Sequence, residues 1–151
     1  MKTDQKILLV ASAGGHWIQL MRLLPAFERH QLSYLSTFPE APGGLPSGRY
    51  TPVRDASMWD KPALLRQMAQ VFLAVARQRP DWVVTTGAAP GYFALVAGKL
   101  LGARTIWIDS VANVEELSLA GRKARRWATH WLTQWPQLAS PSGPTYLGSV
   151  L

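Results

Sequence analysis

A glycine pair followed by a histidine is the first feature of the sequence that could do chemistry. Ser12, Gly14, Gly15 and His16 come directly after an apolar run at Ile7 to Ala11. Glycines let the backbone approach a ligand closely, and a helix that starts behind them favours a phosphate. A neutral imidazole can accept a hydroxyl proton near pH 7, so His16 is the candidate general base. A tight strand-to-helix turn and a helix-capping histidine are the alternatives.

A second loop is made of small residues. Thr86, Gly87, Ala88 and Gly91 separate an apolar stretch at Trp82 to Thr85 from a helical pattern. Small side chains leave backbone N–H groups open to an anion, which makes these four residues candidates for binding a phosphate or an acceptor. Close packing of a helix on a strand requires small residues as well, and the sequence leaves both explanations open.

A third loop is polar where the first two are bare. Asp109, Ser110, Asn113 and Glu115 follow a predicted strand at Thr105 to Asp109. Their side chains can bind sugar hydroxyls or act as acid and base groups. A solvated loop with an Asx turn is the alternative for each of them.

A basic segment with an adjacent tryptophan lies further along the chain. It consists of Arg122, Lys123, Arg125, Arg126 and Trp127. Cations meet anionic headgroups and indoles favour the lipid–water interface, so these residues are candidates for membrane contact. An ordinary solvated face is the alternative. We expect no nucleic-acid partner, because the sequence has no helix-turn-helix signal, zinc knuckle or RNA-recognition motif.

Other common site chemistries lack their residues. The glycines do not follow the dinucleotide-binding pattern, the Gly-Lys-Ser/Thr phosphate loop is absent, and there is no G-x-S-x-G. The three histidines are far apart and the chain has no cysteine, so we expect no metal site and no disulfide.

The segments that must position these loops alternate between strand and helix patterns. Apolar or alternating runs predict strands at residues 7–11, 32–38, 49–54, 82–85, 105–109 and 131–134. Helical spacing predicts helices at residues 17–28, 60–79, 90–101 and 118–128, with Pro25 kinking or ending the first one. Short loops join the segments. The pattern predicts an α/β fold with an open parallel sheet and helices on both faces.

In such a sheet, ligands bind beyond the carboxyl ends of the strands, where the strand order reverses. The three candidate loops all leave strands, so we expect them at that edge. The 151 residues, 48% of them hydrophobic and 17% charged, fit a single globular domain over residues 1–151. The net charge of +7 suggests an anionic partner. No apolar run reaches the roughly 20 residues of a membrane-spanning helix.

Several segments in register carry a resemblance to the PssD family. They are Ser12-Ala13-Gly14-Gly15-His16, Thr85-Thr86-Gly87-Ala88-Ala89-Pro90, the stretch from Lys99 to Ser110, the stretch from Leu117 to Arg122, Gln134-Trp135-Pro136 and the closing Tyr146 to Val150. The resemblance runs from about Lys6 to Leu151. That family includes the membrane-anchoring subunit of the eukaryotic dolichol-linked GlcNAc transferase.

The resemblance implies a fold, and it implies that two subunits bind the two substrates. Family members resemble the N-terminal, Rossmann-like half of MurG-like GT-B glycosyltransferases, which binds the lipid-linked acceptor and the membrane. A separate PssE-like subunit binds the nucleotide sugar. By this resemblance, the chain would help to transfer a sugar from a UDP-sugar to a polyprenyl-diphosphate-linked acceptor in polysaccharide biosynthesis. The UDP-sugar would be a co-substrate held mainly by the partner, and no cofactor is expected.

The chain departs from the family in the third loop. It has Asp109-Ser110 where the family commonly has Glu-Ser, and Asn113 where an Arg is often found. It also lacks the N-terminal membrane helix of the eukaryotic members. We therefore expect a bacterial polysaccharide system and peripheral attachment at the cytoplasmic face of the plasma membrane. A non-catalytic membrane scaffold and a stand-alone nucleotide-binding α/β enzyme are the rival functions.

Overall fold

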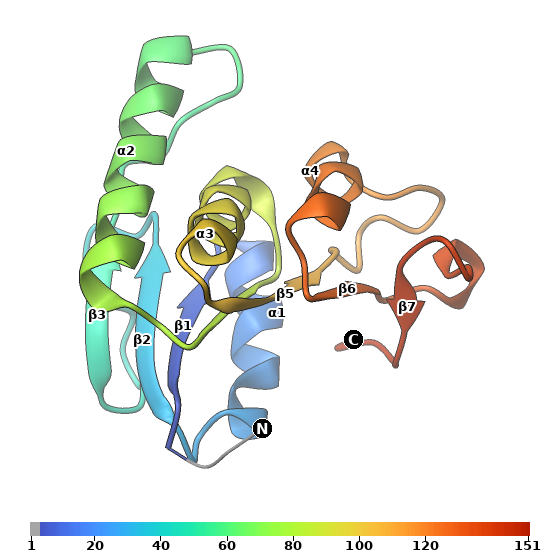
Figure 1. Cartoon of the computed structure of the whole chain (residues 1–151), viewed down its shortest axis with the longest axis horizontal. Helices are drawn as coiled ribbons and strands as arrows, with labels where there is room; N and C mark the ends of the chain where they lie inside the picture. The colour runs from blue at the N-terminus through green and yellow to red at the C-terminus, as the bar shows by residue number, and fades with distance from the viewer. Residues whose placement is uncertain (1–3) are drawn as a thin grey trace.

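The computed structural model describes residues 4–151, and residues 1–3 of the predicted domain lie outside that range. The chain folds into a seven-stranded parallel sheet in the order β3-β2-β1-β4-β5-β6-β7 (Figure 1). The strands are β1 (Lys6–Val10), β2 (Gln31–Ser36), β3 (Gly48–Pro52), β4 (Trp82–Thr85), β5 (Arg104–Ile108), β6 (His130–Thr133) and β7 (Thr145–Tyr146).

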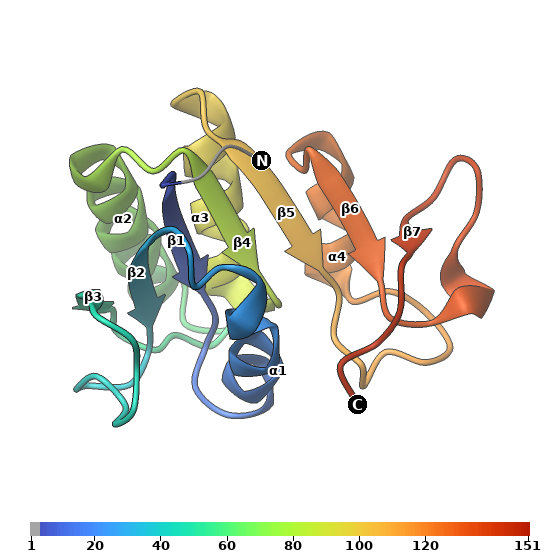
Figure 2. The same ribbon diagram turned by 90° about the horizontal axis from the view of Figure 1, so that it is seen from below.

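The helices lie on both faces of the sheet, as the sequence predicts. They are α1 (Gly15–Leu23), α2 (Lys61–Gln78), α3 (Ala88–Leu100) and α4 (Leu119–Lys123), with 3-10 turns η1 (Leu24–Ala26), η2 (Ala124–Arg126) and η3 (Pro136–Leu138). Figure 2 shows α1 on one face and α2, α3 and α4 on the other. The predicted fold class, a Rossmann-like open parallel sheet, is confirmed.

The central strand β1 is buried on both faces. Ile7 and Leu9 pack with Trp17 and Leu20 on the side of α1. The alternate residues of the strand face α2 and α3, where Leu8 and Val10 pack with Val71 and Val75. Successive side chains of a strand point to opposite faces, so an unbroken apolar run is the expected sequence of a strand covered twice.

The strand order reverses beside β1. This strand pairs with β2 on one side and with β4 on the other, and Val10 lies opposite Thr85 at the carboxyl end. Because the strands are parallel, the chain leaves β1 and β4 at neighbouring points of the same edge. The first two candidate loops therefore lie side by side at the switch point of the sheet.

Local sequence signals explain where α2 begins and ends. Helix α2 begins after Asp60, whose side chain accepts a hydrogen bond from the Ala63 N–H at 3.1 Å, and Pro62 occupies its first turn. It ends at Gln78, and the next residue, Arg79, has a left-handed φ of 47°. Pro80 follows, and the residue before a proline is disfavoured in the helical conformation.

Two helix ends and one strand differ from the predicted ranges. Helix α1 ends at Leu23 rather than near residue 28, which is the early end predicted for Pro25: this residue has no N–H to donate, and the chain continues as one 3-10 turn. Helix α4 ends at Lys123, and the remainder of the predicted 118–128 helix is a 3-10 turn. Strand β7 was not predicted; it has only two residues, Thr145 and Tyr146.

The packing of α3 on β4 can be tested at Gly91. A Cβ atom there would lie 2.0 Å from Thr85 Oγ1, and this hydroxyl also accepts a hydrogen bond from the Gly87 N–H at 3.1 Å. We expect Gly91→Ala to lower the free energy of unfolding by about 1–3 kcal/mol in urea denaturation, since an overpacked core must shift.

The control is Gly43→Ala, at a glycine whose added Cβ would meet no described atom within 4 Å. This variant should stay within about 0.5 kcal/mol of the parent, as surface substitutions generally do. Equal stability of the two variants would contradict the packing explanation.

Candidate functional site

Two helix starts meet at the switch point. Helix α1 begins after Gly14, with a φ of 96°, and α3 begins after Gly87, with a φ of 128°. Glycine has no side chain that could cap a helix, so the first N–H groups of both helices remain available to another acceptor. The positive ends of the two helix dipoles lie at the same edge, which favours an anion there.

His16 and Thr86 join the two loops. The His16 Nδ1 atom lies 3.0 Å from the Thr86 carbonyl oxygen, and the Thr86 hydroxyl donates to the His16 carbonyl oxygen at 2.6 Å. Gly87 lies against the same ring, and a Cβ atom there would be 2.9 Å from Nδ1. The structure therefore brings His16 against two predicted site residues, Thr86 and Gly87, that lie about 70 positions further along the sequence.

The backbone of the second loop is strained at its turn into α3. Gly87 is followed by Ala88, which has a φ of 65° although it is not a glycine. A left-handed conformation costs such a residue about 1–2 kcal/mol. Strain of this kind persists where the surrounding structure fixes the backbone, and it is common at functional sites.

The glycines of the first loop do not serve packing. Gly14 and Gly15 are exposed, and an added Cβ at either position would meet no described atom within 4 Å. Ser12, half-buried, precedes them at the end of β1. The positive φ explains Gly14, but Gly15 has an ordinary φ, so neither packing nor backbone geometry requires it. Close approach of a ligand remains an explanation for Gly15.

Gly91 differs from the other loop residues. It is buried and lies against the Thr85 side chain, so close packing of α3 on β4 accounts for it. Its predicted part in binding a phosphate or an acceptor stays a prediction.

The third loop is organised around Asp109. The Asp109 side chain is 2% exposed, and its carboxylate accepts four hydrogen bonds. The donors are Trp107 Nε1 at 3.1 Å, Asn113 Nδ2 at 3.2 Å, the Ser118 N–H at 3.0 Å and the Ser118 hydroxyl at 2.6 Å. Ser118 also caps α4. The carboxylate therefore holds the loop and the start of α4 together.

The other polar residues of this loop divide between structure and solvent. Ser110 is buried, and its hydroxyl accepts hydrogen bonds from Gln19 Nε2 at 3.1 Å and the Ala112 N–H at 3.2 Å. Asn113 is half-buried, while Glu115 is exposed. Of the four residues predicted here, Glu115 is the one whose side chain faces solvent.

Two buried glutamines, Gln19 and Gln134, are not among the predicted site residues. Gln134 Nε2 donates to Gln19 Oε1 at 2.7 Å and to the Asp109 carbonyl oxygen at 2.9 Å, and its Oε1 accepts from the Val150 N–H at 2.9 Å. Gln19 also accepts from the Val111 N–H at 3.0 Å. These bonds join α1, the third loop, β6 and the C-terminal tail. The sequence signal that could have indicated Gln19 is a polar amide among the apolar residues of the predicted first helix.

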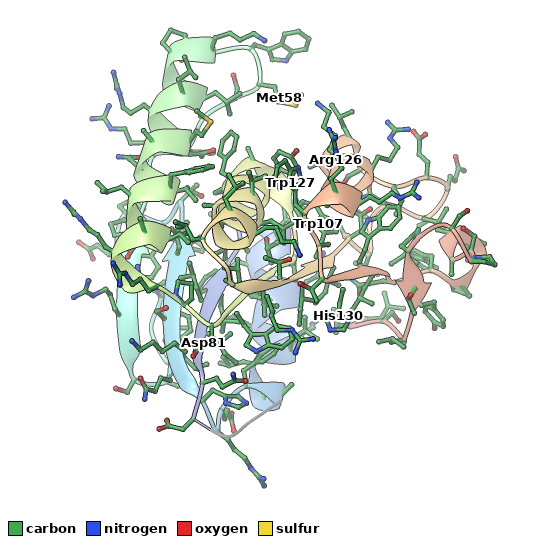
Figure 3. The ribbon with its side chains drawn as sticks, viewed as in Figure 1. Met58, Asp81, Trp107, Arg126, Trp127 and His130 are labelled. Atoms are coloured by element: carbon green, nitrogen blue, oxygen red, sulfur yellow. The ribbon has the colours of Figure 1, made fainter. Side chains whose placement is uncertain are left out.

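The basic segment keeps its cations at the surface. Arg122, Lys123, Arg125 and Arg126 are exposed, and Arg122 pairs with Glu116 at 3.6 Å. Trp127 is partly buried and packs against a cluster that contains Trp107 and Ala124 (Figure 3). Packing holds the Trp127 indole in place, and its predicted membrane contact stays a prediction.

Within residues 4–151, no group of three or more His, Asp or Glu residues is arranged to hold a metal ion. In the same residues, no helix is long and apolar enough to cross a membrane.

Comparison with known sequences gives one informative relative. No protein-family model matches the chain. The UDP-N-acetylglucosamine transferase subunit ALG14 of Eremothecium gossypii is 34% identical over 87 residues, which cover 50% of this chain and 39% of that protein. The chain thus matches about two fifths of the length of this curated relative.

Comparison with solved structures supports the fold. MurG of Acinetobacter baumannii superposes with a TM-score of 0.74 at 13% identity, covering 98% of this chain and 46% of MurG. A Methanocaldococcus jannaschii UDP-GlcNAc 2-epimerase, in complex with UDP-GlcNAc and UDP, superposes with a TM-score of 0.68 at 9% identity, over 95% of this chain and 46% of the epimerase. The domain therefore has the fold of the Rossmann-like half of a GT-B protein.

The role of the Asp109 carboxylate can be separated from ligand binding by a stability measurement. An asparagine at this position cannot accept at both of its terminal atoms. In Asp109→Asn the new NH₂ group would face N–H and O–H groups that now donate to the carboxylate, so part of the network is lost. We expect it to lower the free energy of unfolding by about 2 kcal/mol in urea denaturation.

Glu115→Gln, on the exposed side of the same loop, serves as the control and should change stability by less than about 0.5 kcal/mol. An Asp109→Asn variant with the same free energy of unfolding as the parent would show that the carboxylate does not hold the loop.

Proposed function

We propose that the chain is the acceptor- and membrane-binding subunit of a two-component glycosyltransferase. It would help to move a sugar from a UDP-sugar to a polyprenyl-diphosphate-linked acceptor in polysaccharide biosynthesis. The observation that carries the proposal is the meeting of His16 with Thr86 and Gly87 between two helix starts at the switch point. The identity to a transferase subunit supports it independently.

The site residues have distinct roles in this proposal. The free N–H groups behind Gly14 and Gly87 bind phosphate oxygens of the acceptor or the donor. His16 accepts the proton of the acceptor hydroxyl while that oxygen forms a bond to the anomeric carbon. The bond from the anomeric carbon to the phosphate oxygen breaks, and UDP leaves with its electron pair. No metal or cofactor takes part in this scheme.

In this proposal a second chain completes the enzyme. The superposition covers 98% of this chain and 46% of MurG, so the matched part of MurG corresponds to one half of that fold. We assign the nucleotide-sugar site to a PssE-like partner, which would also choose the donor. GlcNAc is the expected sugar by analogy with the similar subunit, with glucuronate, glucose and galactose as the other candidates.

Two surfaces support attachment to an anionic membrane. The exposed cations of α4 and η2 are the first. The second is α2, which extends with its preceding loop past the carboxyl edge of the sheet (Figure 1). Trp59 in this loop is 92% exposed, and Leu65 and Leu73 on α2 are 61% and 50% exposed. Large exposed apolar side chains on one element and its preceding loop are the reason to propose an interaction site there.

The charges beside this apolar surface favour lipid over protein as its partner. Residues 61–80 contain no carboxylate; the cations Lys61 and Arg66 lie in the half of α2 that follows the loop, and Arg77 and Arg79 lie at its other end. A cationic helix with an apolar stripe suits an anionic headgroup region. Figure 3 shows Met58 in the loop at the tip of α2 and Arg126 in the turn η2 that follows α4. We propose peripheral attachment through α2 with its preceding loop and through the cations of α4 and η2, at the cytoplasmic face of the membrane.

A transfer assay tests the proposed activity. Membranes carrying the lipid-linked acceptor would receive this chain, the partner chain or both, together with a panel of UDP-sugars. We expect sugar transfer only when both chains are present, because neither holds the whole site. His16→Ala in the assembled pair should lower turnover by about 10²–10⁴-fold, the usual contribution of a general base.

Transfer by this chain alone would contradict the two-component reading and favour a stand-alone enzyme. Wild-type turnover of the His16→Ala pair would remove His16 from catalysis. Full transfer by the partner alone would leave this chain as a scaffold.

Binding to vesicles tests the membrane surface. We expect Trp59→Ala to lower partitioning onto vesicles with anionic lipid by about fivefold or more, because an inserted indole loses its apolar contact. Arg125→Gln and Arg126→Gln should each lower it by about fivefold.

The matched control is Leu101→Ala, which removes a 57% exposed side chain just after α3, at the opposite edge of the sheet. Equal losses for Trp59→Ala and Leu101→Ala, or binding that is independent of lipid charge, would exclude this surface.

A further inference from the structure

The hydrogen bond between His16 and Thr86 determines which nitrogen of the imidazole carries the proton. The partner of His16 Nδ1 is a backbone carbonyl oxygen, 3.0 Å away. A carbonyl oxygen only accepts hydrogen bonds, so Nδ1 must donate. In the neutral ring the hydrogen is then on Nδ1, and Nε2 keeps its lone pair.

Three further features hold the ring and the carbonyl in register. The Thr86 hydroxyl donates to the His16 carbonyl oxygen at 2.6 Å, so the two residues exchange hydrogen bonds in opposite directions. Gly87 lies under the ring, where an added Cβ would be 2.9 Å from Nδ1 and 3.0 Å from Cε1. The left-handed conformation of Ala88, with its φ of 65°, turns the chain into α3 directly after this contact.

We infer that Thr86 is a positioning residue that holds His16 in the Nδ1–H tautomer and leaves Nε2 as the proton acceptor of the site. The catalytic consequence rests on the proposed function, whereas the tautomer itself rests only on the geometry of the two loops. Thr86 acts through His16 and does not touch the reacting atoms.

This arrangement matters for the proton transfer. An imidazole with its hydrogen on Nε2 would present a donor to the acceptor hydroxyl and could not take the proton at that atom. With the hydrogen on Nδ1, Nε2 forms the new N–H bond as the hydroxyl O–H bond breaks. The resulting imidazolium still donates from Nδ1 to the Thr86 carbonyl, so the developing charge keeps a hydrogen-bonded partner.

His30 gives an internal reference of the opposite kind. Its Nδ1 atom accepts a hydrogen bond from the Gln5 N–H at 3.2 Å. The hydrogen of the neutral His30 ring is therefore on Nε2. One protein thus contains two histidines for which the structure requires opposite tautomers.

The test is a ¹⁵N NMR spectrum of the labelled chain at about pH 8, where histidine side chains are ordinarily neutral. The His16 signals are assigned by their loss in His16→Gln. We expect a protonated Nδ1 for His16 and a protonated Nε2 for His30. Thr86→Val keeps the backbone carbonyl and the shape of the side chain, but it removes the hydroxyl that holds the carbonyl against the ring. This variant should convert His16 to a mixture of tautomers. Thr86→Ser should restore the Nδ1–H form.

Controls keep the result interpretable. Thr51→Val, at a hydroxyl on the far edge strand β3 that accepts from Gln78 Nε2 at 3.1 Å, should leave the His16 signals unchanged. Circular dichroism checks that each variant is folded. If Thr86→Val does not fold, Gly87→Ala perturbs the same ring from the other side. A His16 ring protonated on Nε2 in the parent, or an unchanged tautomer in the folded variants, would overturn the inference.

The catalytic consequence is measured in the assembled two-chain enzyme. We expect Thr86→Val to lower kcat by about tenfold with little change in KM, in line with the loss of one hydrogen bond, and Thr86→Ser to recover it. An altered tautomer with an unchanged kcat would leave Thr86 as a positioning residue and overturn the role of His16 as base. The spectrum therefore tests the tautomer even if the proposed activity fails.

Discussion

The burial of β1 on both faces is the constraint on which the rest of the structure depends. Its residues from Ile7 to Val10 are fully buried, so α1 must cover one face and α2 with α3 the other. A strand in this position pairs on both edges, with β2 and with β4. The reversal of strand order beside β1 then brings the ends of β1 and β4 together. His16 meets Thr86 because both follow strands that the core has already placed side by side.

The three loops at this edge are built by different physical means. The first two have almost no side chains, and they are fixed by helix starts, by positive φ values at Gly14 and Gly87, and by the paired bonds of His16 and Thr86. The third loop is fixed by side chains, with Asp109 as its centre. A carboxylate that accepts four hydrogen bonds has little capacity left for a ligand. We therefore expect ligands at the first two loops. The third loop supports them by accepting a hydrogen bond at Ser110 from Gln19 on α1.

Sequence patterns predicted the parts of this structure that depend on local periodicity. The buried strands, the two faces of helices and the switch-point position of the first two loops follow from apolar runs and short connections. The early end of α1 at Leu23 follows from Pro25, whose effect depends on how the 3-10 turn packs. The pairing of His16 with Thr86 spans 70 residues, and the buried bonds of Gln134 span up to 115, so no local pattern reveals them. The packing of Trp127 likewise depends on Trp107 beneath it, which periodicity alone does not place.

Because the switch-point edge is exposed, we expect this domain to need a second surface over its site. Gly14 and Gly15 are open to solvent, and the neighbouring loops supply N–H donors and one imidazole. Electrostatic stabilisation by such donors is strong only where water is excluded. A second surface therefore has to close over the edge before the donors and His16 can act on a sugar phosphate. A nucleotide-sugar-binding partner that docks over β1 and β4 would provide both that cover and the donor substrate. The loop before α2, which extends past the carboxyl edge, would bring the membrane and its acceptor to the same edge as the partner, beside Gly14, Gly15 and His16.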